Sequence, residues 1–243
     1  MSPALGEIWV YLSATPLLGL TLTLLAYQGA VWLYRRANHH PLLNPVMIAV
    51  TALVLVLTLT DTPYQTYFDG AQFVHFLLGP ATVALAIPLY AQWQRLRSML
   101  LPLLITLVAG SLTAALSAVG IAAVLGASRE SVMSLAPKSV TMPIAMGVAE
   151  RLGGLPSLTA VLVMSTGIVG AIGARYVYQV LRIEDHAVRG FAIGIASHGI
   201  GTARAFQVSE QAGAFAALAM GLNGLLTAVM LPWILPWLES LLG

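Results

Sequence analysis

The sequence predicts an all-α fold, a polytopic membrane helical bundle that contains broken or re-entrant helices. Only 8% of its 243 residues are charged, whereas soluble domains carry about 25%. The uncharged stretches are long enough to cross a bilayer as helices, which takes about 20 residues. Proline and glycine interrupt several of these stretches beside polar side chains. So few charges cannot cover a surface that faces water, and the composition therefore excludes a soluble globular enzyme.

Composition also excludes several kinds of site and partner. The chain contains no cysteine, so disulfides, thiol nucleophiles, zinc–thiolate sites and iron–sulfur clusters are not expected. The net charge is +2, but the 11 basic residues are spread along the chain and form no basic patch. Nucleic acid is therefore not an expected partner, and we expect no cofactor.

Uncharged runs predict the spans. The runs of sufficient length comprise residues 8–34, 37–60, 70–94, 98–128, 152–174 and 211–238. No basic residue precedes the first run, which predicts a retained helix rather than a cleaved signal peptide. We expect one integral membrane domain over residues 1–243 with about six full spans. Two shorter uncharged runs lie within segments that we expect to be broken or re-entrant, near 131–150 and 190–207.

Basic residues predict the orientation, because short cytoplasmic loops are enriched in Lys and Arg. Arginine pairs follow the first and third runs, at 35–36 and 95–97, whereas acidic residues follow the second run. This pattern places the N-terminus outside and these two loops in the cytoplasm. The basic cluster at 182–189 is then also cytoplasmic. The fourth run ends outside, so the chain must cross the membrane an odd number of times before it reaches this cluster, and the run 152–174 supplies one crossing. The segment 131–150 therefore either enters and returns or crosses as a broken pair, and we favour the re-entrant hairpin.

Helix breakers accompany polar residues in three segments. The breakers are Gly79, Pro80 and Pro88 in the third run, Pro137 and Pro143 in a short segment, and Gly199 and Gly201 in another. Broken backbone at membrane depth persists only where protein buries it or where it lines a wet cavity. A packing kink explains one such break. Three of them, each beside polar side chains, favour a substrate site.

A weak internal repeat connects two of these segments. Residues 79–82 (Gly-Pro-Ala-Thr) align with 199–202 (Gly-Ile-Gly-Thr), and 110–114 align with 224–228 after a short gap. The expected orientation gives the two repeats opposite directions, and inverted repeats that pair broken helices are a transporter arrangement. We therefore expect an inverted repeat, and we include Thr82 among the candidate substrate-binding residues.

Lys138 is the only lysine of the chain and lies between Pro137 and Ser139. A charge at bilayer depth costs about 2.5–3.5 kcal/mol on insertion scales. In one interpretation, Lys138 lies at the interface and its side chain extends to water. In the other, it contacts an anion at the tip of a short helix, where Ser139 and Thr141 add hydroxyl donors and the helix N-terminus adds free N–H groups. We favour the anion contact.

A second polar cluster occupies residues 197–204, Ser-His-Gly-Ile-Gly-Thr-Ala-Arg. Arg204 can bind a carboxylate through two parallel hydrogen bonds. His198 can titrate near neutral pH, although a structural role is the usual one for a lone histidine. These residues predict a proton-coupled or proton-sensitive anion site, to which we also assign Ser197, Gly199, Gly201 and Thr202.

Other polar and small residues have less specific interpretations. Asn223 either faces the same cavity or bonds a neighbouring helix. Ser197 and His198 are adjacent, so their side chains point apart, and no acid lies nearby to orient the histidine. We therefore expect no catalytic residues and no enzyme, and no histidine pair has metal-ligand spacing on one helix face. Gly167, Gly170 and Gly173 predict a stripe that lets helices pack closely.

These polar segments resemble the LrgB/CidB family of bacterial inner-membrane proteins. Residues 78–86, 136–146, 153–160 and 196–205 carry the resemblance, and 219–228 extend it. The Pro-Lys-Ser block and the Ser-His-Gly-Ile-Gly-Thr-Ala-Arg block are specific. Met142 departs from the threonine that we expect in relatives, which weakens the argument for a hydroxyl at that position.

The resemblance implies a multi-pass protein of the bacterial inner (cytoplasmic) membrane with one of two functions. Members were named antiholin-like regulators of murein hydrolase export and autolysis, and they work with a small LrgA/CidA-type membrane partner. Relatives, including a plant plastid envelope protein, transport glycolate, glycerate or pyruvate. A holin-like pore needs no lysine, arginine and histidine on broken helices, so the residue chemistry favours transport. We expect a small-carboxylate transporter in which Lys138 and Arg204 bind the anion, with an LrgA-like partner and homo-oligomers; the regulator is the alternative.

Overall fold

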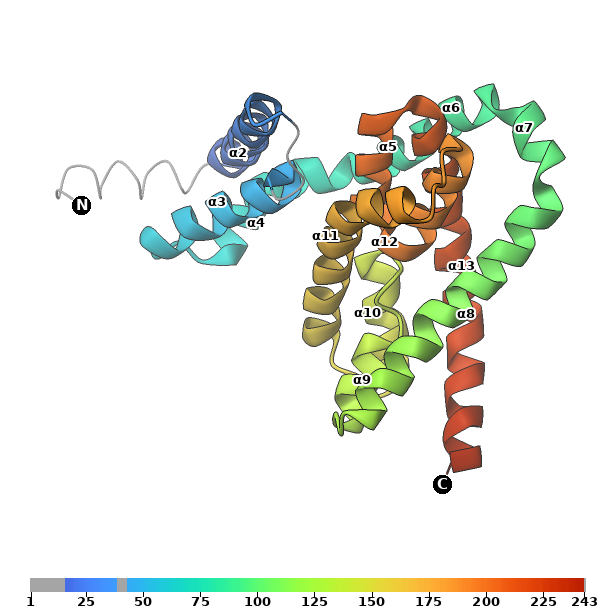
Figure 1. Cartoon of the computed structure of the whole chain (residues 1–243). Coiled ribbons are helices and arrows are strands. Elements are labelled where there is room, and N and C mark those ends of the chain that lie inside the picture. Colours follow the sequence, from blue (N-terminus) through green and yellow to red (C-terminus); the bar gives the residue numbers. More distant parts are fainter. Residues whose placement is uncertain (1–15, 39–42, 243) are drawn as a thin grey trace, which may run out of the picture. The chain divides into compact units, whose positions relative to one another are not determined.

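The computed structural model describes residues 16–38 and 43–242, so that residues 8–15 of the first expected run lie outside the described part. Every element in the described part is a helix (Figure 1). In chain order these are α2 (Pro16–Arg36), α3 (Pro45–Leu59), α4 (Tyr64–Phe76), α5 (Leu78–Ala84), α6 (Ala86–Ala91), α7 (Trp93–Ser98), α8 (Leu100–Val124), α9 (Arg129–Leu135), α10 (Met142–Arg151), α11 (Pro156–Val180), α12 (His186–Val208) and α13 (Glu210–Leu242). The predicted all-α membrane bundle is confirmed.

The chain divides into two compact units, Met1–Ala84 and Leu85–Gly243. In the first unit, α2 packs against α3 and α4. Gly19 permits the close approach of α2 to α4, because a Cβ there would lie 2.4 Å from the Tyr67 carbonyl oxygen. The Thr23 and Tyr67 hydroxyls hydrogen-bond at 2.7 Å across the same contact. The second unit contains every candidate site residue except Thr82.

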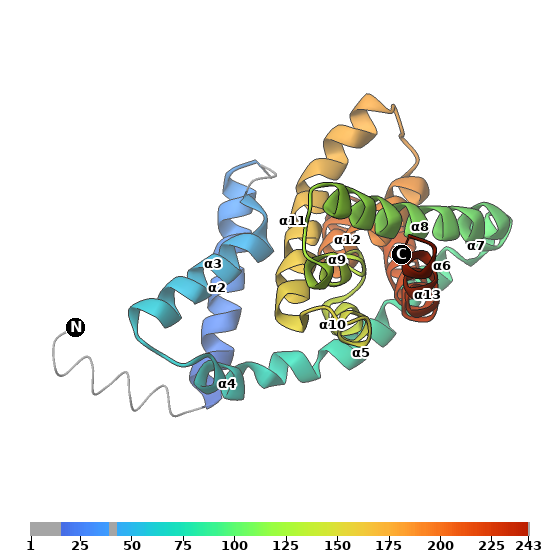
Figure 2. The same cartoon turned by 90° about the horizontal axis from the view of Figure 1, so that it is seen from below.

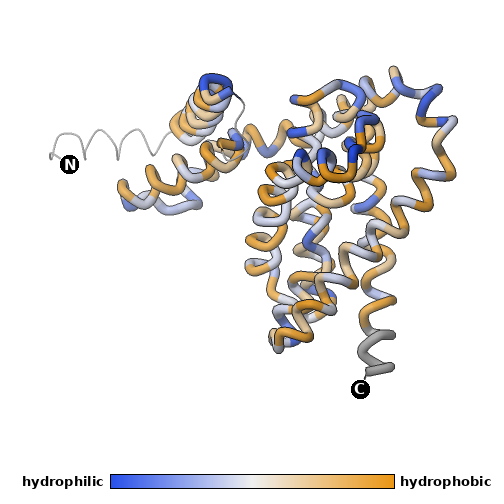
Figure 3. Tube along the Cα trace, in the orientation of Figure 1, coloured by the Kyte–Doolittle hydropathy of each residue, from blue (hydrophilic) through white to orange (hydrophobic). Residues whose placement is uncertain are grey.

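Long apolar helices account for five of the six expected runs. The helices long and apolar enough to cross a membrane are Leu17–Arg36, Tyr64–Ala91, Leu100–Val124, Pro156–Val180 and Glu210–Leu235. In the remaining run, 37–60, the described helix is α3, which has 15 residues. Its length is about 22 Å, whereas the hydrocarbon core of a bilayer is about 30 Å thick. The uncharged run overestimated the length of this helix, because Asn44 and Pro45 carry no charge and so do not end the run. The helix nevertheless begins there, since the Asn44 side chain caps its first turn. Figure 3 shows hydrophobic residues along most of α8 and hydrophilic ones in the preceding α7.

Prolines interrupt the third run at two positions, as expected. α4 and α5 are separated at Leu77, and α5 and α6 at Leu85. Each interruption lies three residues before a proline, Pro80 in one case and Pro88 in the other. A proline removes the hydrogen bond to the carbonyl four residues earlier and its ring crowds that turn, which accounts for the position of both breaks.

Residues 129–151 form a helical hairpin whose two ends lie together. The Ser134 hydroxyl in α9 accepts a hydrogen bond from the Leu155 N–H, just beyond α10, at 2.7 Å. A Cβ on Gly153 would lie 3.2 Å from the Arg129 Nη1 atom at the start of α9. The chain therefore leaves this segment beside the point where it entered, and re-entry of the segment into the membrane stays a prediction. Figure 2 shows the hairpin between α8, α11 and α13, all of which contact it.

Helix α12 packs closely against a neighbour on two sides, and glycines make both contacts possible. On α12, Gly190 and Gly194 face α13: a Cβ on either would lie 2.1 or 2.3 Å from a carbonyl oxygen of α13. On α11, Gly167 and Gly170 face α12, where added Cβ atoms would overlap the His198 and Ser197 side chains. The packing role predicted for the α11 stripe is confirmed at these two glycines, whereas a Cβ on Gly173 would meet nothing within 4 Å.

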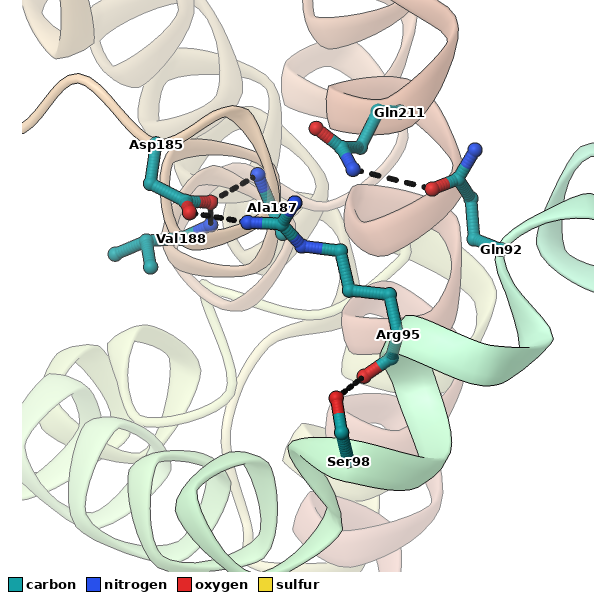
Figure 4. Close-up of polar contacts among 7 residues, drawn as sticks. All are labelled: Gln92, Arg95, Ser98, Asp185, Ala187, Val188 and Gln211. Atoms are coloured by element: carbon teal, nitrogen blue, oxygen red, sulfur yellow. Dashed lines mark hydrogen bonds and ion pairs between the residues drawn. The ribbon is translucent and has the colours of Figure 1, made fainter.

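A polar cluster connects the segment before α8 to the starts of α12 and α13 (Figure 4). Arg95 forms an ion pair with Asp185, whose side chain also caps α12 by accepting from the N–H groups of Ala187 and Val188. Gln211 donates to the Gln92 side chain at 3.1 Å. These contacts hold the α6–α7 turn against the ends of two core helices.

Candidate functional site

The tip of the α9–α10 hairpin presents three of the predicted residues. Lys138 is partly buried, and its ammonium donates to the Ser139 hydroxyl at 3.4 Å. Ser139 is buried. Thr141 is the residue before α10 and has extended backbone dihedral angles, but its side chain makes no capping hydrogen bond. Pro143 has no N–H and the Ala145 N–H donates to the Thr141 carbonyl at 2.9 Å, so in the first turn of α10 the Met142 and Ile144 N–H groups are the ones left without a capping side chain.

Helix α12 is broken at Ser197 and His198. Both residues have non-helical backbone angles. The φ of His198 is 41°, in the left-handed region that residues other than glycine rarely adopt. The His198 ring is buried, and its Nε2 atom donates to the Val163 carbonyl of α11 at 3.0 Å. The Thr202 hydroxyl donates to the His198 carbonyl at 2.8 Å. Because its ring is buried against α11, His198 has the geometry of a structural histidine that stabilises the break.

Asn223 of α13 connects the hairpin tip to the break in α12. Its amide nitrogen donates to the Ile195 carbonyl at 3.0 Å and to the Ser139 carbonyl at 3.4 Å. Its amide oxygen accepts from the Ser111 hydroxyl of α8 at 2.6 Å, and that hydroxyl also lies 3.3 Å from the Thr227 hydroxyl. Of the two roles left open for Asn223, the structure shows the bonds to neighbouring segments.

An open groove of about 390 Å³ brings the hairpin tip and the break together. Its lining residues are Lys138, Leu162, Ser165, Thr166, Val169, Gly170, Ala196 and Ser197. The Ser197 residue is only 1% exposed, and its hydroxyl has no hydrogen-bond partner among the described residues. Lys138 forms no ion pair with a carboxylate in the described part of the chain. The groove thus combines a cation with a hydroxyl that has no partner, and an anion would satisfy both.

Arg204 does not share this groove with Lys138. It lines a separate cavity of about 280 Å³ that also receives Arg175 from α11 and Arg189 from the start of α12. The expected pairing of Lys138 and Arg204 around one anion is therefore not the arrangement in the structure. Ser197, at the break in α12, lines the groove, whereas Arg204 lines the other cavity together with Gly190 and Ile193 from before the break.

Three further predicted residues are placed as follows. A Cβ on Gly201 would lie 2.7 Å from the Ser197 Cβ, so this glycine makes room for the break. Gly199 has open space around it, with only the Met220 sulfur at 3.8 Å from an added Cβ. Thr82 belongs to the first compact unit, where its hydroxyl donates to the Leu78 carbonyl at 2.6 Å. A role for Thr82 in the site stays a prediction.

Sequence reasoning missed several residues of this region. Ser165 and Thr166 line the groove, Ser111 and Thr227 bond around Asn223, and Arg175 and Arg189 line the arginine cavity. A signal was available for the first pair, which stands as adjacent hydroxyls in an apolar run directly before Gly167. Arg189 was interpreted only as part of the basic cluster at 182–189 that sets the orientation, and Arg175 was not considered.

Fold and site together define a multi-pass membrane protein that holds polar groups on interrupted helices. The family comparison agrees: the model of the LrgB-like family matches residues 23–237, and the chain belongs to this family. It is 35% identical to the uncharacterized protein YwbG of Bacillus subtilis over 91% of this chain and 98% of that one. It is 36% identical to the uncharacterized protein YxaC of the same organism, over 89% and 94%.

A relative with a functional name is more distant. The chain is 28% identical to the antiholin-like protein LrgB of Bacillus cereus, over 92% of this chain and 97% of that one. No solved structure gives a significant match to the chain.

Proposed function

We propose that the protein transports small carboxylates of the glycolate, glycerate or pyruvate type. The observation that carries the proposal is the groove that Lys138 lines together with Ser197, whose buried hydroxyl has no hydrogen-bond partner among the described residues. A carboxylate accepts charge-assisted hydrogen bonds from an ammonium and ordinary ones from hydroxyls, and the groove supplies both, with Ser165 and Thr166 as further donors.

The helix breaks around the groove support the same ligand. α10 begins just after the hairpin tip without a side-chain cap, and the second half of α12 begins just after Ser197 and His198. The N-terminus of a helix favours negative charge, because its first N–H groups are free and its dipole is positive there. Discontinuous helices that direct such ends toward a substrate carboxylate are a known transporter device.

Uptake of radiolabelled pyruvate and glycolate into proteoliposomes tests the proposal. We expect saturable uptake by the wild-type protein and a loss of about 10-fold or more in Lys138→Gln, because a charge-assisted hydrogen bond contributes about 1.5–3 kcal/mol. Lys138→Arg keeps the charge and serves as the matched control, with partial uptake expected. Failure of the wild-type protein to transport either acid, with and without an LrgA-like partner, overturns the proposal.

Ser197→Ala separates a ligand contact from a structural role. The Ser197 hydroxyl makes no hydrogen bond to a described residue, so its removal costs no internal bond and leaves the melting temperature unchanged or higher. If the hydroxyl contacts the carboxylate, KM for uptake rises by about 3- to 10-fold. An unchanged KM removes Ser197 from the site.

Proton coupling through His198 is a separate part of the proposal. The observation behind it is the position of the imidazole one residue beyond Ser197, where the ring bonds to the Val163 carbonyl of α11. Uptake driven by an inward proton gradient should disappear in His198→Gln if the ring carries the proton. Gradient-driven uptake that persists in the variant assigns His198 to structure alone.

Regulation of murein hydrolase export and autolysis is the second candidate. One observation favours it: a relative that matches over nearly its whole length is named antiholin-like protein LrgB. An LrgA-like partner, a homo-oligomer and an inner-membrane location are proposals for both functions. Measured autolysis rates in cells that carry Lys138→Gln distinguish the two, because a purely regulatory protein without an anion ligand does not need this charge.

A further inference from the structure

The cavity that Arg204 lines is rich in guanidinium groups. Three arginines from two helices line it, Arg175, Arg189 and Arg204, together with Tyr178 and Gln179. No lining residue within the described part of the chain is acidic. Arg204 also donates to the Gln207 side chain at 3.1 Å, and guanidinium groups bind carboxylates through paired hydrogen bonds.

Arg189 is held in place before any ligand binds. Its Nε atom donates to the Ile183 carbonyl at 2.6 Å, and its guanidinium lies 5.7 Å from the centre of the Tyr178 ring. The Tyr178 hydroxyl in turn donates to the Arg189 carbonyl at 2.8 Å. These contacts leave the two terminal nitrogens of Arg189 oriented for a ligand, and a preorganised fork is suited to carboxylate.

Small residues provide the space between these arginines. Ala171 and Ala174 of α11, Gly190 and Ala205 of α12, and Ala212 of α13 line the cavity. Gly190 is there because α12 approaches α13 too closely for a side chain. The volume of about 280 Å³ is therefore a product of helix packing and is large enough for a small organic acid.

The cavity continues the line of the Lys138 groove along α11. Residues 162–170 of α11 contribute to the groove, and residues 171–179 contribute to the arginine cavity. Thr166 and Arg175 are nine residues apart on one helix, a separation of about 13 Å along its axis. Gly170 lines the groove and the next residue, Ala171, lines the arginine cavity, so along α11 the groove ends where the cavity begins.

We infer that Arg175, Arg189 and Arg204 form a second binding site for the carboxylate, next to the groove on the route of the substrate. The identity of the ligand rests on the proposed function. At the end of α11 the arginines draw the anion in, and Lys138 receives it deeper along the helix. Basic residues that line one end of a path raise the local concentration of an anion and its rate of entry.

Residue-resolved protection of arginines tests this inference without measuring transport. The full-length protein in nanodiscs of phosphatidylcholine is treated with phenylglyoxal in the presence or absence of pyruvate, and modification is followed by mass spectrometry. We expect pyruvate to slow modification of Arg175 and Arg204 by about threefold or more, and pyruvamide, its neutral analogue, to have no effect. Arg182 lies in the neighbouring loop outside the cavity and is the internal control. Equal rates with and without pyruvate overturn the inference.

Two variants keep this test separate from the proposed function. In Lys138→Gln, protection should persist while uptake is lost, because the arginine cavity does not contain Lys138. In Arg175→Gln, an exposed position, uptake at low pyruvate should fall by about 3- to 10-fold relative to Arg182→Gln.

Protection without any uptake by the wild-type protein retains the anion site and rejects transport. Protection of the arginines by phosphatidylglycerol nanodiscs alone, with no response to pyruvate, assigns the cavity to a lipid headgroup and overturns the inference.

Discussion

Helix α12 packs closely against α13 and against α11, and the two contacts differ in which atoms approach the glycines. Against α13, Gly190 and Gly194 admit backbone carbonyls of the neighbouring helix, and the packed surface is apolar. Against α11, Gly167 and Gly170 admit the side chains of His198 and Ser197, which are polar and belong to the break. Small residues let membrane helices approach closely in either case. The first contact therefore serves stability, whereas the second makes room for polar groups at the groove.

The largest expected effect tests the apolar contact. A Cβ at position 194 would lie 2.3 Å from the Ala216 carbonyl oxygen, and a backbone atom cannot turn aside as a side chain can. Gly194→Val should destabilise the protein by about 3 kcal/mol or more, seen as loss of the monodisperse peak in fluorescence-detected size-exclusion chromatography. Gly221→Ala in α13, where an added Cβ meets nothing within 4 Å, is the control and should fold normally. A well-folded Gly194→Val protein contradicts the contact.

A smaller effect is expected at the polar contact. A Cβ on Gly170 would lie 1.7 Å from the Ser197 hydroxyl oxygen, so Gly170→Ala displaces a side chain rather than a backbone. We expect a loss of about 1–3 kcal/mol of stability together with loss of carboxylate uptake. Combining it with Ser197→Gly removes the obstructing side chain and should restore most of the melting temperature. Gly173→Ala, with open space around it, should behave as wild type, and a double variant no more stable than Gly170→Ala contradicts this arrangement.

Asn223→Ala tests how the hairpin tip is held beside the break. The substitution removes three hydrogen bonds that end on Ser111, Ser139 and Ile195. Such bonds contribute about 0.6 kcal/mol each in membrane proteins, so a loss of about 2 kcal/mol is expected in detergent-denaturation titrations. KM for uptake should rise as the tip loosens. Equal stability of Asn223→Ala and wild type means that the tip is held by other contacts.

The smallest effect concerns the exposed polar cluster at the start of α12. Burial raises the pKa of Asp185, but the N–H groups of Val188 and Ala187 and the Arg95 guanidinium outweigh it, so the pKa lies below its usual value. Because the folded state favours the charged form, Asp185 contributes stability above about pH 4 and loses it as the pH falls further. Asp185→Asn keeps the cap and loses the charge.

The measurement for Asp185 is the difference in melting temperature between wild type and Asp185→Asn as a function of pH. The wild-type advantage should be small at neutral pH, since the ion pair is largely solvated, and should be lost as the pH falls through the lowered pKa of Asp185. An advantage that grows as the pH falls contradicts the assigned sign.

The sequence predicted the fold class and the breaks well. Proline positions predicted the interruptions near Leu77 and Leu85, because the missing hydrogen bond and the crowded turn are local effects. For residues 131–150 the loop charges predicted a re-entrant hairpin or a broken crossing pair, and the structure shows a helical hairpin at 129–151 whose two ends lie together. The span at 37–60 was overestimated, because counting charges alone does not register the capping side chain of Asn44.

The site was predicted less completely. Lys138 and Ser197, about 60 residues apart in the chain, were both selected for their polarity next to helix breakers, and they meet in one groove. Arg204 was selected for the same reason but lies in another cavity. Which face of α12 a residue occupies beyond the break depends on the angles at Ser197 and His198, and those angles are not readable from composition or spacing.

By itself, the sequence determined that this chain crosses a membrane, where its helices break and which polar residues stand at the breaks. These properties follow from transfer free energies and from proline and glycine geometry, which act within one helix. Only the tertiary structure decided that Asn223 connects the tip to the break, that His198 bonds to α11 and that Lys138 and Arg204 line two separate cavities. Those outcomes depend on how closely helices approach each other, and glycines on α11 and α12 set that distance.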